Sequence, residues 1–200
     1  MQYVTWADDR GLDLRGADIS PRLTGVLGGL VQQVPGAAAR IRTGIVSGPV
    51  TVTVQRADRA PAEVPPGWED VVEVGCRVTD GQVVVAGPYA DDPDSAAALV
   101  APGIVWFRLR VHARGRDAGD DLTTTDPHEE YLLITWPAEL SPPTVLAAHS
   151  GIARRNLTAP PPSAAAVRGV DASSDRDRER RAAAQDNLLR ISREDHRGRP

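Results

Sequence analysis

The residue types best suited to chemistry gather in one acidic loop of the sequence. The loop carries seven ionisable side chains: Asp117, Asp120, Asp121, Asp126, His128, Glu129 and Glu130. Calcium binds several hard oxygen ligands, and a loop can supply them. The spacing matches no EF-hand pattern, because the glycine that such a loop needs is absent from the expected position. We therefore interpret it as a solvated loop, with a metal-dependent enzyme that uses residues 117–130 as an alternative.

Two histidines offer a second candidate for metal chemistry. His112 and His128 flank the acidic loop, and they would face one another if the strands on either side of it are paired. Two imidazoles and a carboxylate are suitable ligands for a transition metal. A surface histidine on a strand is far more common than a ligand. The sequence therefore predicts no metal site and no cofactor.

The other reactive residue types lack the partners that catalysis requires. Cys76 is the single cysteine and lies in an apolar stretch, where thiols are usually buried and inert. It excludes an intramolecular disulfide and any zinc site that needs two thiolates. No serine stands in a G-x-S-x-G motif, and no glycine-rich phosphate loop is present. The sequence predicts no catalytic residue and favours a non-enzymatic role.

An arginine-rich segment beside an aromatic residue is the best candidate for binding. Alternation along residues 104–113 places Trp106, Arg108 and Arg110 on one face. Arginine next to an aromatic ring is typical of an interface hot spot. The predicted binding residues are Trp106, Arg108, Arg110, Arg114 and Arg116. The alternative is a solvent-facing sheet whose arginines pair with acids on neighbouring strands.

The elements that must position these side chains are predicted to be strands. The chain of 200 residues is 41% hydrophobic but has one Phe and one Met, so its core depends on Val, Leu, Ile and Ala. Branched residues favour strands. Strands are predicted at 1–6, 39–46, 50–55, 68–78, 82–86, 104–113 and 130–136, the last ending at Pro137. The strands 39–46 and 50–55 are expected to form a hairpin, and 68–78 is expected to turn at Asp80-Gly81 into 82–86.

Two further segments complete the predicted organisation. Residues 26–34 have helical apolar spacing but contain Gly28-Gly29, so helix and strand remain open. The predicted fold is all-β, an antiparallel, jelly-roll-like β-sandwich over residues 1–140. Residues 141–174 are predicted to be a flexible Pro- and Ala-rich linker, and 175–197 a charged C-terminal helix.

Charge is divided unevenly along the sequence. Residues 1–150 contain 12 arginines and 20 acidic residues, a net charge of −8, whereas 151–200 contain 11 arginines and 7 acidic residues, a net charge of +4. An acidic domain argues against nucleic-acid binding, because phosphate contacts require positive surface. The sequence also shows no signal peptide and no apolar run that spans a bilayer. We expect a cytoplasmic protein with no membrane association.

Three segments resemble a family of small uncharacterised actinobacterial proteins. They are residues 68–74 (WEDVVEV), 102–110 (PGIVWFRLR) and 114–117 with 130–137 (RGRD and EYLLITWP). The strand order and the proline-glycine turn are similar, more distantly, to the competence nuclease-inhibitor (ComJ-like) family. That resemblance implies a β-domain that pairs with a nuclease, although Trp106 stands where the family usually has tyrosine.

Three functions are compatible with these observations. The first is a non-catalytic protein-binding module, an inhibitor or immunity-type protein whose acidic surface meets a basic partner such as a nuclease. The second is a small-molecule or carbohydrate-binding β-sandwich that uses Trp68, Trp106 or Trp136 as a stacking platform. The third is the metal-dependent enzyme of the acidic loop.

Overall fold

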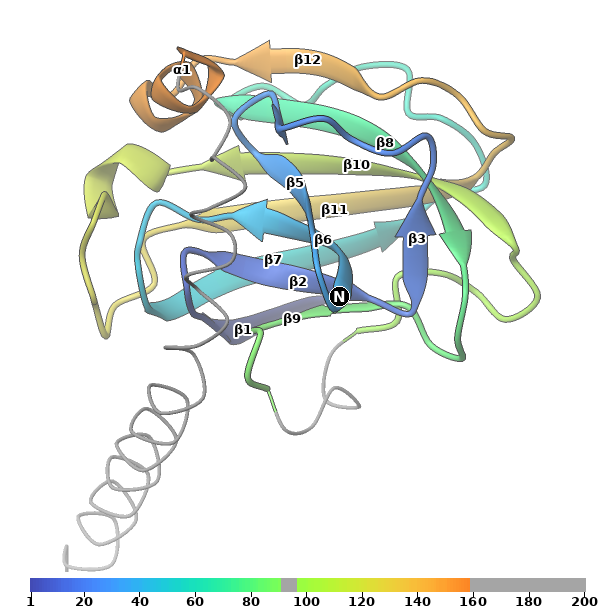
Figure 1. Cartoon of the computed structure of the whole chain (residues 1–200), viewed down its shortest axis with the longest axis horizontal. Helices are drawn as coiled ribbons and strands as arrows, with labels where there is room; N and C mark the ends of the chain where they lie inside the picture. The colour runs from blue at the N-terminus through green and yellow to red at the C-terminus, as the bar shows by residue number, and fades with distance from the viewer. Residues whose placement is uncertain (91–96, 159–200) are drawn as a thin grey trace, which may run out of the picture. The chain divides into compact units, whose positions relative to one another are not determined.

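The computed structural model describes residues 1–90 and 97–158, and these form a two-layer all-β structure (Figure 1). The predicted charged helix 175–197 and the predicted linker beyond residue 158 lie outside the described residues. Within the described part of the chain, the helices are too short to cross a bilayer.

The larger sheet has seven strands and holds most of the residues considered above. Its strands are β1 (Gln2–Ala7), β3 (Ala17–Ile19), β7 (Gly48–Arg56), β8 (Asp70–Val78), β10 (Trp106–Arg114), β11 (Glu130–Pro137) and β12 (Thr144–Ala148). They lie in the order β1-β7-β11-β10-β8-β12, and β3 pairs with the far end of β8 beside β12. All of these pairs are antiparallel except β7 with β11, which run parallel. The sandwich is therefore confirmed, but it is not purely antiparallel.

The smaller sheet has five strands and covers one face of the larger one. It contains β4 (Val26–Leu27), β5 (Val31–Val34), β6 (Ala37–Arg42), β2 (Gly11–Arg15) and β9 (Val84–Ala86), in that order. A short 3-10 helix, η2 (Arg116–Gly119), follows β10, and the helix α1 (Gly151–Thr158) follows β12.

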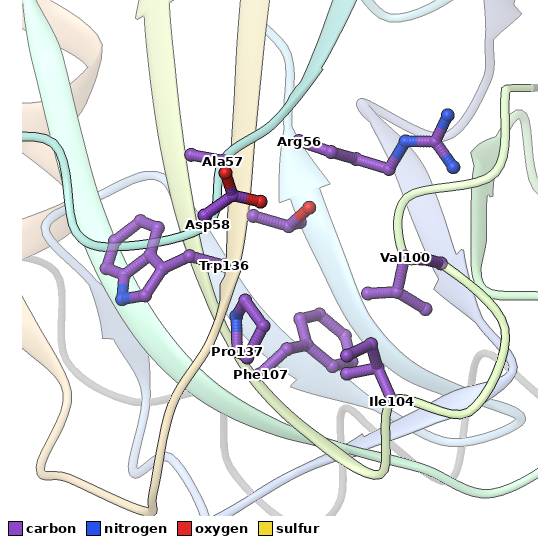
Figure 2. Close-up of a pocket in the computed structure, with 10 residues that line it drawn as sticks. Arg56, Ala57, Asp58, Val100, Ile104, Phe107, Trp136 and Pro137 are labelled. Atoms are coloured by element: carbon purple, nitrogen blue, oxygen red, sulfur yellow. The ribbon is translucent and has the colours of Figure 1, made fainter.

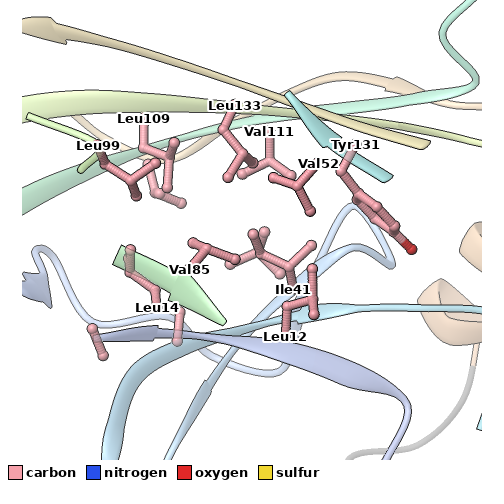
Figure 3. Packing of buried hydrophobic residues seen from close by; sticks show 14 of the residues in the cluster. Leu12, Leu14, Ile41, Val52, Val85, Leu99, Leu109, Val111, Tyr131 and Leu133 are labelled. Carbon is pink, nitrogen blue, oxygen red and sulfur yellow. The ribbon is translucent and has the colours of Figure 1, made fainter. Parts of the chain in front are cut away.

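The core lies between the two sheets and is built mainly of aliphatic residues (Figure 3). Phe107, Leu109 and Val111 of β10 point into it, as the alternation in the sequence predicts. They meet Leu12 and Leu14 of the smaller sheet across the interface. Each large aliphatic side chain buried here contributes about 1.5–3 kcal/mol to folding, so the paired apolar faces hold the layers together.

The two predicted hairpins are wrong, although the strands themselves exist. The chain leaves the smaller sheet after β6 and enters the larger sheet as β7, so the two strands never pair. In the same way β8 and β9 belong to different sheets despite the Asp80-Gly81 turn between them. Alternation identifies a half-buried strand, but it carries no information on which neighbour the strand selects.

Residues 26–34 form a tight hairpin, β4–β5, rather than a helix. Gly28 and Gly29 make its turn with φ of 54° and 65°, a region that favours glycine. A Cβ at Gly29 would lie 2.5 Å from Cα of Ala153, so the hairpin also needs this glycine to approach α1. The two glycines that weaken the helical pattern therefore also explain why residues 26–34 form a hairpin instead of a helix.

The folded unit extends beyond the predicted boundary at residue 140. The strand β12 and the helix α1 both belong to the compact unit Met1–Ala159. Pro142 and Pro143 are not the start of a linker, because the chain after them pairs with β8. Glu130–Trp136 is accordingly not the last strand.

Candidate functional site

The predicted binding residue Arg116 is fully buried and serves the fold. It forms an ion pair with Asp70, with Nε and Nη2 at 3.0 and 2.5 Å from one carboxylate oxygen. Nη1 donates to the carbonyls of Gly29 and Arg42, and Nη2 also donates to the hydroxyl of Ser150. Arginine has five N–H donors, and all five are used here. Arg116 therefore has no donor left for a partner molecule.

Glu129 of the acidic loop is buried in the same region. Its carboxylate accepts hydrogen bonds from the backbone N–H groups of Gly44 and Ile45, at 3.1 and 2.6 Å, and from the hydroxyl of Tyr131. Burial raises the pKa of Glu129, and these hydrogen bonds and the charge of Arg116 act against that rise. Together Arg116, Asp70 and Glu129 form what we call the buried polar network, which joins both sheets to η2 and α1.

The other acids of the loop are dispersed rather than gathered around an ion. Asp117 accepts hydrogen bonds from the N–H groups of Gly151 and Ile152 at the start of α1. Partial burial works against ionisation there, but these bonds and the nearby arginines lower the pKa of Asp117 overall. Asp120 and Asp121 pair with Arg10. No group of three or more metal-ligating side chains occurs in residues 1–90 and 97–158.

Arg108 and Arg110 are buried on the outer face of the larger sheet, so the expectation that they face solvent is wrong. Their exposed fractions are 4% and 6%. Both Nε atoms donate to Glu73, at 3.2 and 2.6 Å. The remaining donors of Arg108 reach Ser141, Pro142 and Thr144 after β11, and those of Arg110 reach the carbonyls of Pro61 and Glu63. The two arginines thus hold two loops across the sheet, which alternation alone cannot reveal.

Trp106 and Arg114 are the two predicted binding residues that remain partly exposed. Arg77 lies over the Trp106 ring at 5.5 Å, and Arg114 lies over the Trp68 ring at 4.9 Å while pairing with Glu130. Trp106 and Arg114 are the first and last residues of β10, about 27 Å apart at 3.4 Å per residue. The structure therefore does not bring the five predicted residues into one surface.

The strands on either side of the acidic loop, β10 and β11, do pair, but His112 and His128 differ in burial. His112 is fully buried, its Nδ1 donates to the carbonyl of Leu132, and its ring lies 5.5 Å from that of Trp68. Its Nε2 has no hydrogen-bond partner among the described residues. Burial lowers the pKa of His112, so the neutral ring is favoured. His128 is exposed in the acidic loop.

Cys76 is buried in β8, as the sequence predicts. Burial raises the pKa of its thiol to about 12, so the thiolate that reacts or binds metal is not formed near neutral pH.

One cavity lies at the end of the sandwich opposite the buried polar network, where three neighbouring strands of the larger sheet meet (Figure 2). Its volume is about 200 Å³. The lining comes from the end of β7, the start of β10, the end of β11 and the loop before β10. It comprises Arg56, Ala57, Asp58, Val100, Ala101, Ile104, Phe107, Thr135, Trp136 and Pro137.

The local sequence explains why the cavity forms there. Thr135 lies beside Arg56 in the parallel pair, and Phe107 lies opposite Pro137, so the walls are in register. The Thr135 hydroxyl donates to the carbonyl of Leu99, which fixes the loop that leads to β10. Gly103, with φ of 87°, then turns that loop back toward Ile104. The loop therefore forms an apolar wall that faces the strands.

The rim of the cavity carries two charged side chains of opposite sign. Arg56 and Asp58 are both exposed, and neither side chain forms a hydrogen bond or ion pair with the residues that the structure describes. Figure 2 shows the Arg56 side chain extended toward Val100, away from Asp58. A concave apolar site with a few polar groups at its mouth is the usual form of a small-molecule site.

Sequence reasoning missed this cavity almost entirely. Only Trp136 was considered, as a stacking platform, and Arg110 covers its ring at 5.4 Å. The other lining residues come from three segments of the chain that no motif connects. Comparison of the chain with family models, with curated proteins and with solved structures finds no match.

Proposed function

We propose that the protein is a non-catalytic β-sandwich that binds a small, largely apolar molecule in the cavity at the ends of β7, β10 and β11. The observation that carries this proposal is the cavity itself. It is lined by Val100, Ile104, Phe107 and Trp136, and its two rim charges form no hydrogen bond or ion pair among the described residues.

The volume of the cavity limits the size of the ligand. An apolar cavity of about 150 Å³ in another protein holds one benzene molecule. A cavity of about 200 Å³ therefore suits one ring, or a branched chain of similar size, with a single polar substituent. It is smaller than the usual range for drug-sized molecules, which begins at about 300 Å³.

Fluorine NMR of a ligand tests the proposal directly. We would titrate 4-fluorobenzamide and 4-fluorobenzoate with the full chain and follow line broadening at pH 7. The variant Ala101→Phe places a ring at the mouth of the cavity and is expected to abolish saturable binding. The matched control is Ala62→Phe, because Ala62 is exposed and does not line the cavity. Absence of saturable binding to the unmodified chain, or equal binding by Ala101→Phe, would contradict the proposal.

A second candidate function is protein binding by the exposed residues at the start of β10. Val105 and Trp106 are 54% and 36% exposed, and Arg77 lies over the Trp106 ring. Tryptophan with arginine is enriched at interface hot spots, and the acidic charge of residues 1–150 would favour a basic partner. Trp106→Ala is expected to lose a partner that the full chain and Arg114→Ala both capture. Equal capture by all three chains would contradict this candidate.

A further inference from the structure

We propose that the ligand of this cavity is a carboxylate, and that Arg56 binds its negative charge. This inference rests on the proposed function and adds the chemical class of the ligand. It begins from a contrast among the arginines in the described residues. Arg40, Arg108, Arg110, Arg114 and Arg116 each form an ion pair with a protein carboxylate. Arg56 does not, although it lines a cavity.

The sheet fixes the position of Arg56, while its guanidinium has no partner in the part of the chain that the structure describes. The residue is the last of β7 and lies beside Thr135 of β11. The next residue is also anchored, because the Ala57 N–H donates to the carbonyl of Thr135 at 2.8 Å. Beyond this backbone the side chain is exposed. The guanidinium can therefore reach a ligand without breaking a contact that the fold needs.

The chemistry of guanidinium favours a carboxylate over other polar groups. Its planar fork donates two parallel hydrogen bonds to the two oxygens of a carboxylate, and such charged pairs are stronger than neutral ones. The apolar walls, from Val100, Ile104 and Phe107, would then hold the body of the ligand. A ring carboxylate satisfies both parts of the site at once.

The negative charge of Asp58 on the rim affects anionic and cationic ligands in opposite ways. A carboxylate ligand must approach on the Arg56 side, since Asp58 repels it, and Figure 2 shows the Arg56 guanidinium extended away from Asp58. Removal of the Asp58 charge should therefore strengthen the binding of an anion. A cationic ligand of the same size would show the opposite preference.

The test compares three ligands of similar size that carry a negative, no or a positive charge at pH 7: 4-fluorobenzoate, 4-fluorobenzamide and 4-fluorobenzylamine. Each is titrated into the full chain at pH 7 and followed by fluorine NMR. We expect benzoate to bind at least about tenfold more tightly than benzamide, as for other charge-assisted hydrogen bonds. Arg56→Gln is expected to remove this difference by weakening benzoate alone, whereas Asp58→Asn strengthens benzoate binding.

Arg59→Gln is the matched control, because it removes an exposed arginine near the site that does not line the cavity. It is expected to leave the benzoate affinity unchanged. Equal binding of benzoate and benzamide would overturn the inference and leave the proposed function intact. Tighter binding of benzylamine would overturn it in favour of Asp58. Failure of all three ligands to bind would contradict the proposed function itself.

Discussion

The two ends of the sandwich use arginine and acid in opposite ways. At one end Arg116 and Asp70 are completely enclosed, and every donor of the guanidinium has a protein acceptor. At the other end Arg56 and Asp58 lie exposed beside a cavity, and neither is paired with another residue in the described ranges 1–90 and 97–158. The same residue types therefore stabilise the fold at one end and are available for a ligand at the other. The two ends differ in how many guanidinium donors are already used, because an arginine with no donor left cannot bind a ligand.

The largest expected effect comes from breaking the buried polar network. Asp70→Asn removes the carboxylate with which the buried Arg116 guanidinium forms its ion pair, so we expect a loss of about 3–5 kcal/mol in the free energy of unfolding. Urea denaturation measures this loss. Arg56→Gln is the comparison at the other end and is expected to change stability by less than about 0.5 kcal/mol. Similar losses of stability for the two variants would contradict the proposal that only the buried pair stabilises the fold.

A smaller loss is expected from Glu73, which pairs with both Arg108 and Arg110. Glu73→Gln keeps the shape of the side chain but removes the shared negative charge, and we expect a loss of about 2–3 kcal/mol. Limited proteolysis should then cleave within residues 57–67 sooner, since Arg110 holds the carbonyls of Pro61 and Glu63. Unchanged stability and cleavage would show that these arginines do not secure the loop.

His112 is expected to make the stability of the protein depend on pH. Its folded pKa lies below that of the unfolded chain, so the unfolded state binds the proton first. Stability is then complete above the unfolded pKa of about 6.5 and falls as pH drops below it, by at most about 1.4 kcal/mol per pH unit. Urea denaturation between pH 7.5 and 5 measures this slope. His112→Phe should flatten it, whereas the exposed control His128→Gln should not.

The smallest effect is expected at the exposed pair of Arg114 with Glu130. Arg114→Ala should cost less than about 1 kcal/mol, because water and salt screen an exposed ion pair. The Trp68 fluorescence should nevertheless change, since Arg114 covers that ring. A loss of stability comparable to that of Asp70→Asn would show that the exposure of an arginine does not indicate how much it contributes to stability.

The sequence predicts the faces of the strands better than their neighbours. The alternation that places Phe107 and Leu109 in the core is confirmed, because side chains on a strand point to opposite faces in turn. The same alternation places Arg108 on the outer face correctly but says nothing of what covers that face. The loops 57–67 and 138–143 and the start of β12 cover it, so a predicted binding surface becomes a set of buried ion pairs.

The candidate site was beyond prediction for a related reason. Arg56, Val100 and Phe107 come together only because β7, β11 and β10 are neighbours in the sheet. That order depends on β7 joining the larger sheet rather than pairing with β6, and no local pattern encodes this choice. The acidic loop drew attention because its charges are adjacent in sequence, yet the fold disperses them.

A chemical-shift map tests the central contrast between the two ends most directly. Amide spectra of the full chain would be recorded during a titration with benzoate at pH 7. We predict saturable shifts at the cavity, for Ala57, Asp58 and Thr135, and none at Gly29 or Ser150 of the buried polar network. Shifts centred on the network, or no saturable shift at the cavity, would contradict the assignment of ligand binding to the Arg56 end.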